Sequence, residues 1–126
     1  MIIDFHAHIA PPWLIQQRQD WVGRDATFAE LFAHPKARLA TAPELIESMD
    51  RARVALSVVS NFGWARHQLC QRTNDYLMEA VARYPERLVG FGAVQPEAGE
   101  EALREVEHFV RGGLRGIGEL MPDTQG

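Results

Sequence analysis

Asp4-Phe5-His6-Ala7-His8 follows the apolar residues Met1-Ile2-Ile3 and precedes Ala10-Pro11-Pro12. Consecutive apolar residues predict a short buried strand over residues 2–5, of the kind found in parallel sheets that are covered on both faces. Side chains two residues apart on a strand point to the same face, with Cα atoms about 6.5 Å apart. A strand that ends in His-x-His therefore presents two imidazoles side by side, and His6 and His8 can converge on one divalent ion.

Alternating strand and helix signals follow this segment. Buried strands are expected where β-branched or glycine-interrupted apolar runs occur, at residues 54–60, 87–94 and 114–120. Helices are expected at about residues 41–53, 65–84 and 99–111, with a shorter one at 27–32 inside the otherwise irregular stretch 10–39. The helix over 41–53 has a capping threonine at Thr41. The helix over 99–111 is expected to bury Leu103, Val106 and Val110.

This order of elements predicts the fold class. Repeated strand–helix units with short connections imply parallel strands that are joined by right-handed crossovers. The chain is therefore expected to be an α/β protein. Neither a linker nor a low-complexity segment interrupts it, so residues 1–126 are expected to form a single domain.

Composition excludes several classes of function. The chain has 126 residues, is 46% hydrophobic and has a formal net charge of −4, with no basic block that would bind nucleic acid. No apolar run approaches the ~18 residues of a membrane span, and no signal peptide precedes the first strand. The lone Cys70 cannot form an internal disulfide and is expected to be a small buried hydrophobe. A cytoplasmic location is therefore expected.

Two carboxylates are candidates for the same site as the histidines. In Arg115-Gly116-Ile117-Gly118-Glu119, strand alternation places Glu119 on one face and both glycines on the other, where they let a neighbouring element approach closely. Glu119 is expected either to complete the metal site or to be a solvated residue at a strand edge. Asp4 is expected either to accept a hydrogen bond that orients a ligand histidine or to pair with an arginine in the interior of the fold.

Further polar and aromatic residues follow the predicted strands and are candidates for contact with a small-molecule substrate: Trp13, Phe62, Trp64 and Gln95. Ordinary loop packing is the alternative for these aromatic residues. The other histidines are expected to be surface or packing residues: His34, His67 and His108.

The opening Ile3-Asp4-Phe5-His6-Ala7-His8 resembles the first strand of the amidohydrolase superfamily, and more narrowly that of the amidohydrolase-2 branch. This branch includes enzymes like aminocarboxymuconate-semialdehyde decarboxylase and pyrone-dicarboxylate lactonase. The segments Tyr84-Pro85-Glu86-Arg87-Leu88-Val89-Gly90-Phe91 and Gly113-Leu114-Arg115-Gly116-Ile117-Gly118-Glu119 are similar to its third and fourth strands. Gly118-Glu119 is also similar to the metal-binding glutamate segment of TatD-type deoxyribonucleases.

The resemblance implies a (β/α)8 barrel, of which these residues would be the first four strands, a half barrel. It implies one or two divalent metals, commonly zinc, with His6 and His8 as ligands and Glu119 as a candidate third ligand. The metal would activate a water that attacks an amide, ester or lactone carbon. In decarboxylating relatives the same water serves acid–base chemistry instead.

Several features of the family have no counterpart in this sequence. Family members take further histidine ligands from strands five and six, and an aspartate from strand eight acts as general acid and base. No residue here replaces that aspartate, so no catalytic residue is assigned and the isolated chain is expected to be incomplete and inactive. A TatD-like nuclease is disfavoured by the acidic charge.

A non-catalytic half-barrel module is the alternative to an enzyme. Half a barrel leaves inward strand faces and two sheet edges uncovered, an apolar area larger than the about 300–600 Å² that monomers usually expose. Self-association into a homo-oligomer that mimics a closed barrel is therefore expected.

Overall fold

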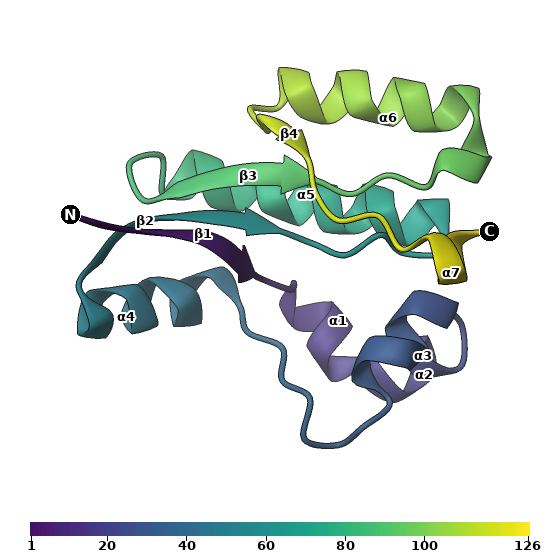
Figure 1. Cartoon of the computed structure of the whole chain (residues 1–126), viewed down its shortest axis with the longest axis horizontal. Helices are drawn as coiled ribbons and strands as arrows, with labels where there is room; N and C mark the ends of the chain where they lie inside the picture. Colours follow the sequence, from purple (N-terminus) through teal and green to yellow (C-terminus); the bar gives the residue numbers. More distant parts are fainter.

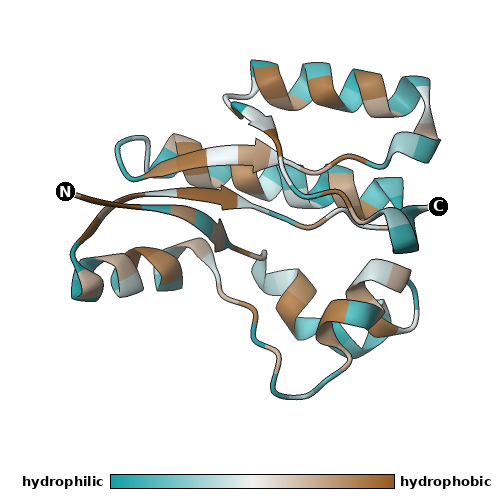
Figure 2. Ribbon diagram, in the orientation of Figure 1, coloured by the Kyte–Doolittle hydropathy of each residue, from teal (hydrophilic) through white to brown (hydrophobic).

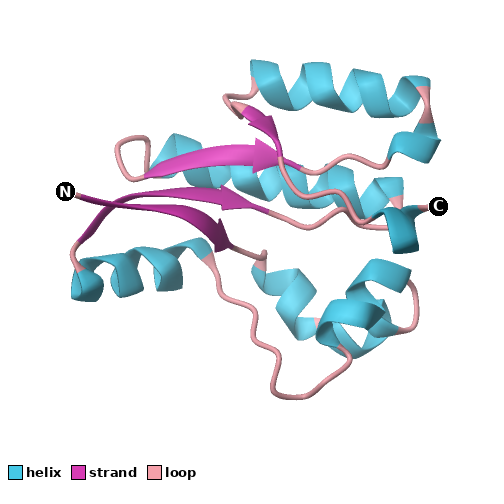
Figure 3. Ribbon diagram, in the orientation of Figure 1, coloured by secondary structure: helices cyan, strands magenta, loops and turns pink.

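Four parallel strands form one sheet in the order β1-β2-β3-β4 in a computed structural model that describes all residues, 1–126 (Figures 1 and 3). Each strand pairs with the next one along the chain, as expected when every crossover winds in the same direction. The α/β class is therefore confirmed. The strands are β1 (Ile2–His8), β2 (Val54–Ser60), β3 (Leu88–Gly92) and β4 (Gly116–Ile117).

Three helices connect the strands close to where the sequence predicts them: α4 (Ala42–Ala52), α5 (His67–Arg83) and α6 (Glu100–Arg111). The Thr41 side chain accepts a hydrogen bond from the Glu44 amide, so it caps α4 as expected. Arg53 ends the helix in the left-handed conformation, with φ of 57°. The short 3-10 helix η1 (Pro96–Ala98) lies just before α6.

The buried face of α6 differs from the prediction. Leu103 and Val110 are 67% and 53% exposed, whereas Phe109 is fully buried. Val106 is partly buried and packs against the core as expected. The Phe109 ring lies directly over Gly92, where a Cβ would be only 2.5 Å from it. This close approach of the ring to β3 fixes the rotation of the helix and turns the other two apolar side chains outward.

The long segment between β1 and α4 is more helical than the sequence suggests. It contains α1 (Pro12–Gln16), α2 (Arg18–Val22) and α3 (Ala26–Phe32), which lie together beyond the carboxyl end of β1 (Figure 1). Only α3 corresponds to a predicted helix. The other two have five residues each, too few for an apolar periodicity to be visible. The four-residue α7 (Pro122–Gln125) after β4 was not predicted for the same reason.

The buried side chains form two separate clusters. One lies between the sheet and helices α4, α5 and α6, and includes Val59, Leu77 and Phe109. The other joins α1, α2 and α3 to the loop after β2 and is rich in aromatic residues: Trp21, Phe28, Phe32 and Trp64. The second cluster packs beside the carboxyl ends of the strands, where a parallel α/β sheet places its functional groups.

Strand β1 is not buried as the sequence predicts. Ile2 is 54% exposed and Phe5 is 76% exposed, and the apolar start of this strand is visible in Figure 2. The reason is that β1 is at one edge of the sheet, and no element covers its inner face. β4 at the other edge has only two paired residues, fewer than the predicted 114–120, and its Ile117 is 48% exposed.

Cys70 lies in the aromatic cluster and is fully buried. Burial raises the pKa of its thiol to about 12, so the reactive thiolate is scarce at neutral pH. The expected role as a small buried hydrophobe agrees with this placement. The described helices include none with both the length and the apolar character needed to cross a membrane.

Candidate metal centre

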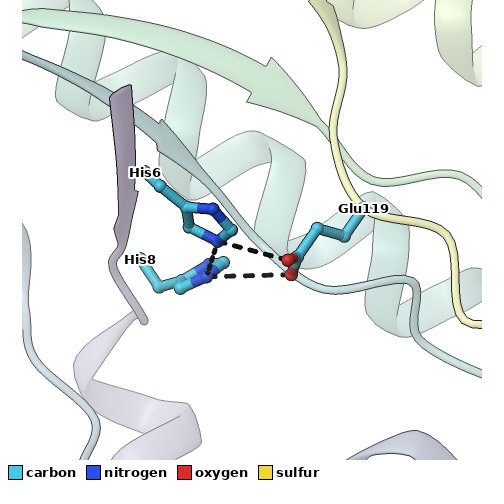
Figure 4. Close-up of side chains that lie close together, drawn as sticks. All are labelled: His6, His8 and Glu119. Carbon is cyan, nitrogen blue, oxygen red and sulfur yellow. Dashed lines mark hydrogen bonds and ion pairs between the residues drawn. The ribbon is translucent and has the colours of Figure 1, made fainter. Parts of the chain in front are cut away.

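Three side chains meet beyond the carboxyl ends of the two edge strands (Figure 4). His6 and His8 come from the end of β1, and Glu119 follows β4 by two residues. The Nε2 atoms of the histidines lie 2.9 Å apart. Glu119 Oε1 lies 3.2 Å from His6 Nε2, and its Oε2 lies 3.7 Å from His8 Nε2. The structure thus brings together the three residues that the sequence indicates as candidate metal ligands.

Glu119 reaches the histidines because the chain after β4 passes very close to β2. A Cβ at Gly118 would lie 2.9 Å from Ser60 Cβ, closer than side chains tolerate. The predicted close approach of a neighbouring element therefore occurs at Gly118. At Gly116 a Cβ would meet the Phe91 ring at an ordinary 3.4 Å.

His8 is held more firmly than His6. Its Nδ1–H donates to the Ser60 carbonyl oxygen at 3.1 Å, and its ring stacks on Phe62 with centroids 4.1 Å apart and planes 20° apart. A carbonyl oxygen can only accept, so this hydrogen bond places the proton on Nδ1 and leaves the Nε2 lone pair of the neutral ring free. The side chain of His8 is 27% exposed, against 62% for His6.

The electrostatic environment favours the form of His8 that binds metals. Burial lowers the pKa of His8 below its usual value, and this effect exceeds the opposing influence of the Ser60 carbonyl and the Glu119 carboxylate. The nearby His6 lowers the pKa of His8 further. His8 is therefore mostly neutral at pH 7, the protonation state that an imidazole ligand requires.

The spacing of the ligand atoms fits a divalent cation. Two nitrogens bound to the same tetrahedral zinc at about 2.0–2.1 Å lie about 3.3 Å apart. The three separations of 2.9, 3.2 and 3.7 Å lie around that value. Two imidazole nitrogens and one carboxylate also form a ligand set that zinc, manganese and iron accept. The residues present can therefore hold a metal and leave other coordination positions open.

Asp4 makes no hydrogen bond or ion pair with either imidazole ring. Its Oδ1 accepts a hydrogen bond from the His6 backbone amide at 3.0 Å. The reason is a register shift against β2: Asp4 pairs with Ser57 and Ala7 pairs with Val59, so β1 has an extra residue between these positions. The alternation that would place Asp4 beside the histidines is broken. The expected orienting role is taken instead by the Ser60 backbone carbonyl, which residue types do not reveal.

Of the four residues expected to contact substrate, only Phe62 touches the ligand cluster. Trp64 is 1% exposed, and its Nε1–H donates to Thr73 Oγ1 in the core. Gln95 is buried, and its amide donates to the carbonyls of Ala65 and Gln125. Trp13 packs under the Arg72 guanidinium, 3.6 Å from the ring centroid, on the helical side of the fold. These three residues stabilise the fold around the site.

Comparison with known proteins identifies the family. A family model described as amidohydrolase matches residues 3–126. The chain belongs to the amidohydrolase family. The resemblance to amidohydrolases that was inferred from the His-x-His strand is therefore confirmed.

Solved structures show the same fold. 5-Carboxyvanillate decarboxylase from Novosphingobium aromaticivorans, with bound manganese, matches with a TM-score of 0.73 and 23% identity over 93% of this chain and 41% of that one. Dihydroxybenzoic acid decarboxylase from Polaromonas sp. JS666, also with manganese, matches with a TM-score of 0.61 and 24% identity over 92% of this chain and 37% of that one. 4-Oxalomesaconate hydratase from Rhodopseudomonas palustris matches with a TM-score of 0.58 and 18% identity over 93% of this chain and 40% of that one.

The amidohydrolase chain spans about two fifths of the length of these neighbours. Its four parallel strands and their helices correspond to the first part of a TIM barrel, which confirms the predicted half barrel. The cluster of His6, His8 and Glu119 therefore lies at the carboxyl face, where TIM-barrel enzymes have their active sites.

Proposed function

We propose that this chain supplies one side of the metal centre of a metal-dependent enzyme. His6 and His8 would bind a divalent cation through Nε2, and Glu119 would bind it through its carboxylate. The observation that carries the proposal is the convergence of these ligand atoms, all within 4.8 Å of one another. The fold supports it, because β1 and β4 both end at the face of the barrel that carries reactive groups.

The chain's own residues have separable tasks. A bound cation would act as a Lewis acid that polarises an oxygen and lowers the pKa of a coordinated water. The neutral imidazoles would add no charge to the site, while Glu119 would add one negative charge that offsets part of the cation's. The proposed metal site is open to a substrate, since the side chains of His6 and Glu119 are 62% and 37% exposed.

Decarboxylation of an aromatic carboxylic acid is the reaction that we favour. Two of the neighbours described above are decarboxylases that act on such acids and hold manganese, which also makes manganese a stronger candidate than the zinc expected from the sequence. Hydrolysis of an amide, ester or lactone is the second candidate, supported by the description of the family model. Both reactions use the same metal centre.

Metal analysis of protein purified without chelator tests the proposal. We expect about one equivalent of manganese or zinc per chain, removable with a chelator and restored by either ion. Absence of bound metal after incubation with both ions would favour the non-catalytic module. For the isolated 126-residue chain we expect metal binding without turnover, because its four strands supply no general acid–base aspartate.

The reaction itself is tested with the protein expressed from its own gene and loaded with manganese. Release of CO2 from a hydroxylated aromatic acid would support decarboxylation. Opening of a lactone or cleavage of an amide without CO2 would support hydrolysis instead. The metal-free protein is the control for both assays.

Gly118→Ala is expected to weaken metal binding about 10-fold, the size of effect seen when support of a ligand is lost. The new Cβ would force the chain after β4 away from Ser60, and Glu119 would move with it. Gly116→Ala is the matched control, because its Cβ would make only ordinary contacts with Phe91. Titration calorimetry with Mn²⁺ measures both variants. Equal affinities for them would contradict this account of how Glu119 is placed.

We also propose that a second copy covers the exposed inner face of the sheet in the isolated chain. β1 and β4 are the two free edges of one parallel sheet, so a copy related by a two-fold axis along the barrel would pair β4 with its partner's β1. The same contact would cover Phe5 and Ile117, which are now exposed.

Sedimentation velocity at micromolar concentration is expected to show a dimer. Phe5→Ser would weaken the dimer strongly, because it replaces a large exposed apolar side chain on this face. Leu103→Ser is the control, since Leu103 is also largely exposed, at 67% against 76% for Phe5, but lies on the outer side of α6. A monomer at all concentrations would exclude this association.

A further inference from the structure

The loop that follows β2 is held rigidly beside His8. Four buried side chains form hydrogen bonds with the backbone of this loop. Three of them donate to carbonyl oxygens: Thr27 Oγ1 to Gly63 at 2.8 Å, Gln125 Nε2 to Trp64 at 3.1 Å, and Gln95 Nε2 to Ala65 at 2.7 Å. The fourth, Asp25, accepts through Oδ2 from the Arg66 amide at 2.8 Å. All four are at least 94% buried. The position of Phe62 within this loop is therefore fixed by the fold.

Phe62 in turn is locked between aromatic rings. Its ring meets those of Phe32 and Trp64 edge-to-face, each with centroids 5.6 Å apart. Its remaining face stacks on His8 at 4.1 Å. A continuous set of contacts thus runs from the aromatic cluster to a ligand of the proposed metal site. Edge-to-face and stacked rings favour defined orientations.

We propose that Phe62 is a positioning residue: together with the Ser60 carbonyl it fixes the ring of His8, so that Nε2 is aimed at the cation before the cation binds. The ring of His8 has two torsions, and the hydrogen bond at Nδ1 alone leaves the ring free to tilt about that bond. Stacking on Phe62 removes the tilt. This inference deepens the proposed function and rests on it.

His6 has no comparable support. Its ring contacts His8 edge-on at 4.8 Å and pairs with Glu119, and its side chain is mostly exposed. The two histidines therefore have different roles in binding. His8 provides a fixed direction, and His6 adapts to an ion that is already held.

Metal affinity of Phe62 variants tests the proposal. Phe62→Leu is expected to weaken Mn²⁺ binding about 10-fold by calorimetry, as loss of a residue that orients a metal ligand does. Phe62→Tyr retains the stacked ring and is expected to restore the affinity to within about 3-fold of the original. Phe28→Leu is the matched control: it removes a ring from the same aromatic cluster that contacts Phe32 and Trp64 but makes no ring contact with Phe62 or His8, so it lowers stability without changing the affinity.

A second measurement does not need the metal. In metal-free protein with ¹⁵N-labelled histidine, the His8 Nδ1–H is expected to give one sharp tautomer in the original chain, in Phe62→Tyr and in Phe28→Leu. A broadened or mixed signal is expected in Phe62→Leu. If Phe62→Leu and Phe28→Leu behave alike, Phe62 has only a packing role and the inference fails. If the original chain binds no Mn²⁺, the proposed function fails, and the histidine signals still decide the role of Phe62.

Discussion

The double variant His6→Ala/His8→Ala is expected to lose metal binding completely, and each single variant is expected to lose about 100-fold in affinity. Structural zinc sites with four ligands have binding free energies of about 10–16 kcal/mol, so one ligand contributes on the order of 3 kcal/mol, or about two powers of ten. The loss should be large because the described cluster has only three ligand residues, and no neighbouring group replaces an imidazole.

His108→Ala is the control for these variants. His108 is exposed and pairs with Asp75 at 3.4 Å on the helical side, away from the proposed site. It should bind Mn²⁺ with unchanged affinity, which separates loss of a ligand from a general effect of removing histidine. Unaltered metal content in the double variant would mean that the ion binds elsewhere, and the proposed site would have to be abandoned.

Glu119→Gln tests the third ligand in the same assay. The amide keeps the shape of the side chain and removes its negative charge, so affinity is expected to fall while the protein remains as stable as before. Because the glutamate side chain is 37% exposed, solvent screens part of its charge. We therefore expect a smaller loss than for either histidine, about 10-fold.

The parts of the site that sequence could predict depend on local periodicity. His6 and His8 lie two residues apart on one strand, so their convergence needs only the alternation of side chains. Glu119 requires one further step, that parallel strands bring their carboxyl ends to the same edge of the barrel. The order of strands and helices likewise follows from local patterns, the apolar runs of buried strands and the helical spacing of apolar residues. This is why α4, α5 and β2 lie where they were expected.

The parts that could not be predicted depend on contacts between distant segments. The register shift that turns Asp4 away from the histidines is a property of the pairing of β1 with β2. The Ser60 carbonyl is a backbone group, so no residue type marks it as the partner of His8. The orientation of α6 follows from the fit of Phe109 over Gly92. None of these features has a periodic signal in the sequence.

Asp25→Ala is expected to lower the free energy of unfolding by about 3 kcal/mol. The carboxylate is 2% exposed and accepts hydrogen bonds from the amides of Phe28 at 2.9 Å and Arg66 at 2.8 Å. The first of these caps α3, and the second joins α3 to the loop after β2. Loss of a cap costs about 0.5–2 kcal/mol, and loss of a hydrogen bond to a charged group costs about 1.5–3 kcal/mol.

Urea unfolding monitored by tryptophan fluorescence measures this loss, since Trp21 and Trp64 are both buried in the cluster next to Asp25. Asp20→Ala is the matched control, because Asp20 is exposed and its side chain makes no described hydrogen bond, so its effect should stay within about 0.5 kcal/mol. Asp25→Asn keeps one accepting oxygen but turns an NH2 group toward the other amide, and should fall between the two. Equal unfolding midpoints for Asp25→Ala and Asp20→Ala would show that the loop beside His8 is held by packing alone. The orientation of Phe62 would then depend on the aromatic rings around it rather than on the buried carboxylate.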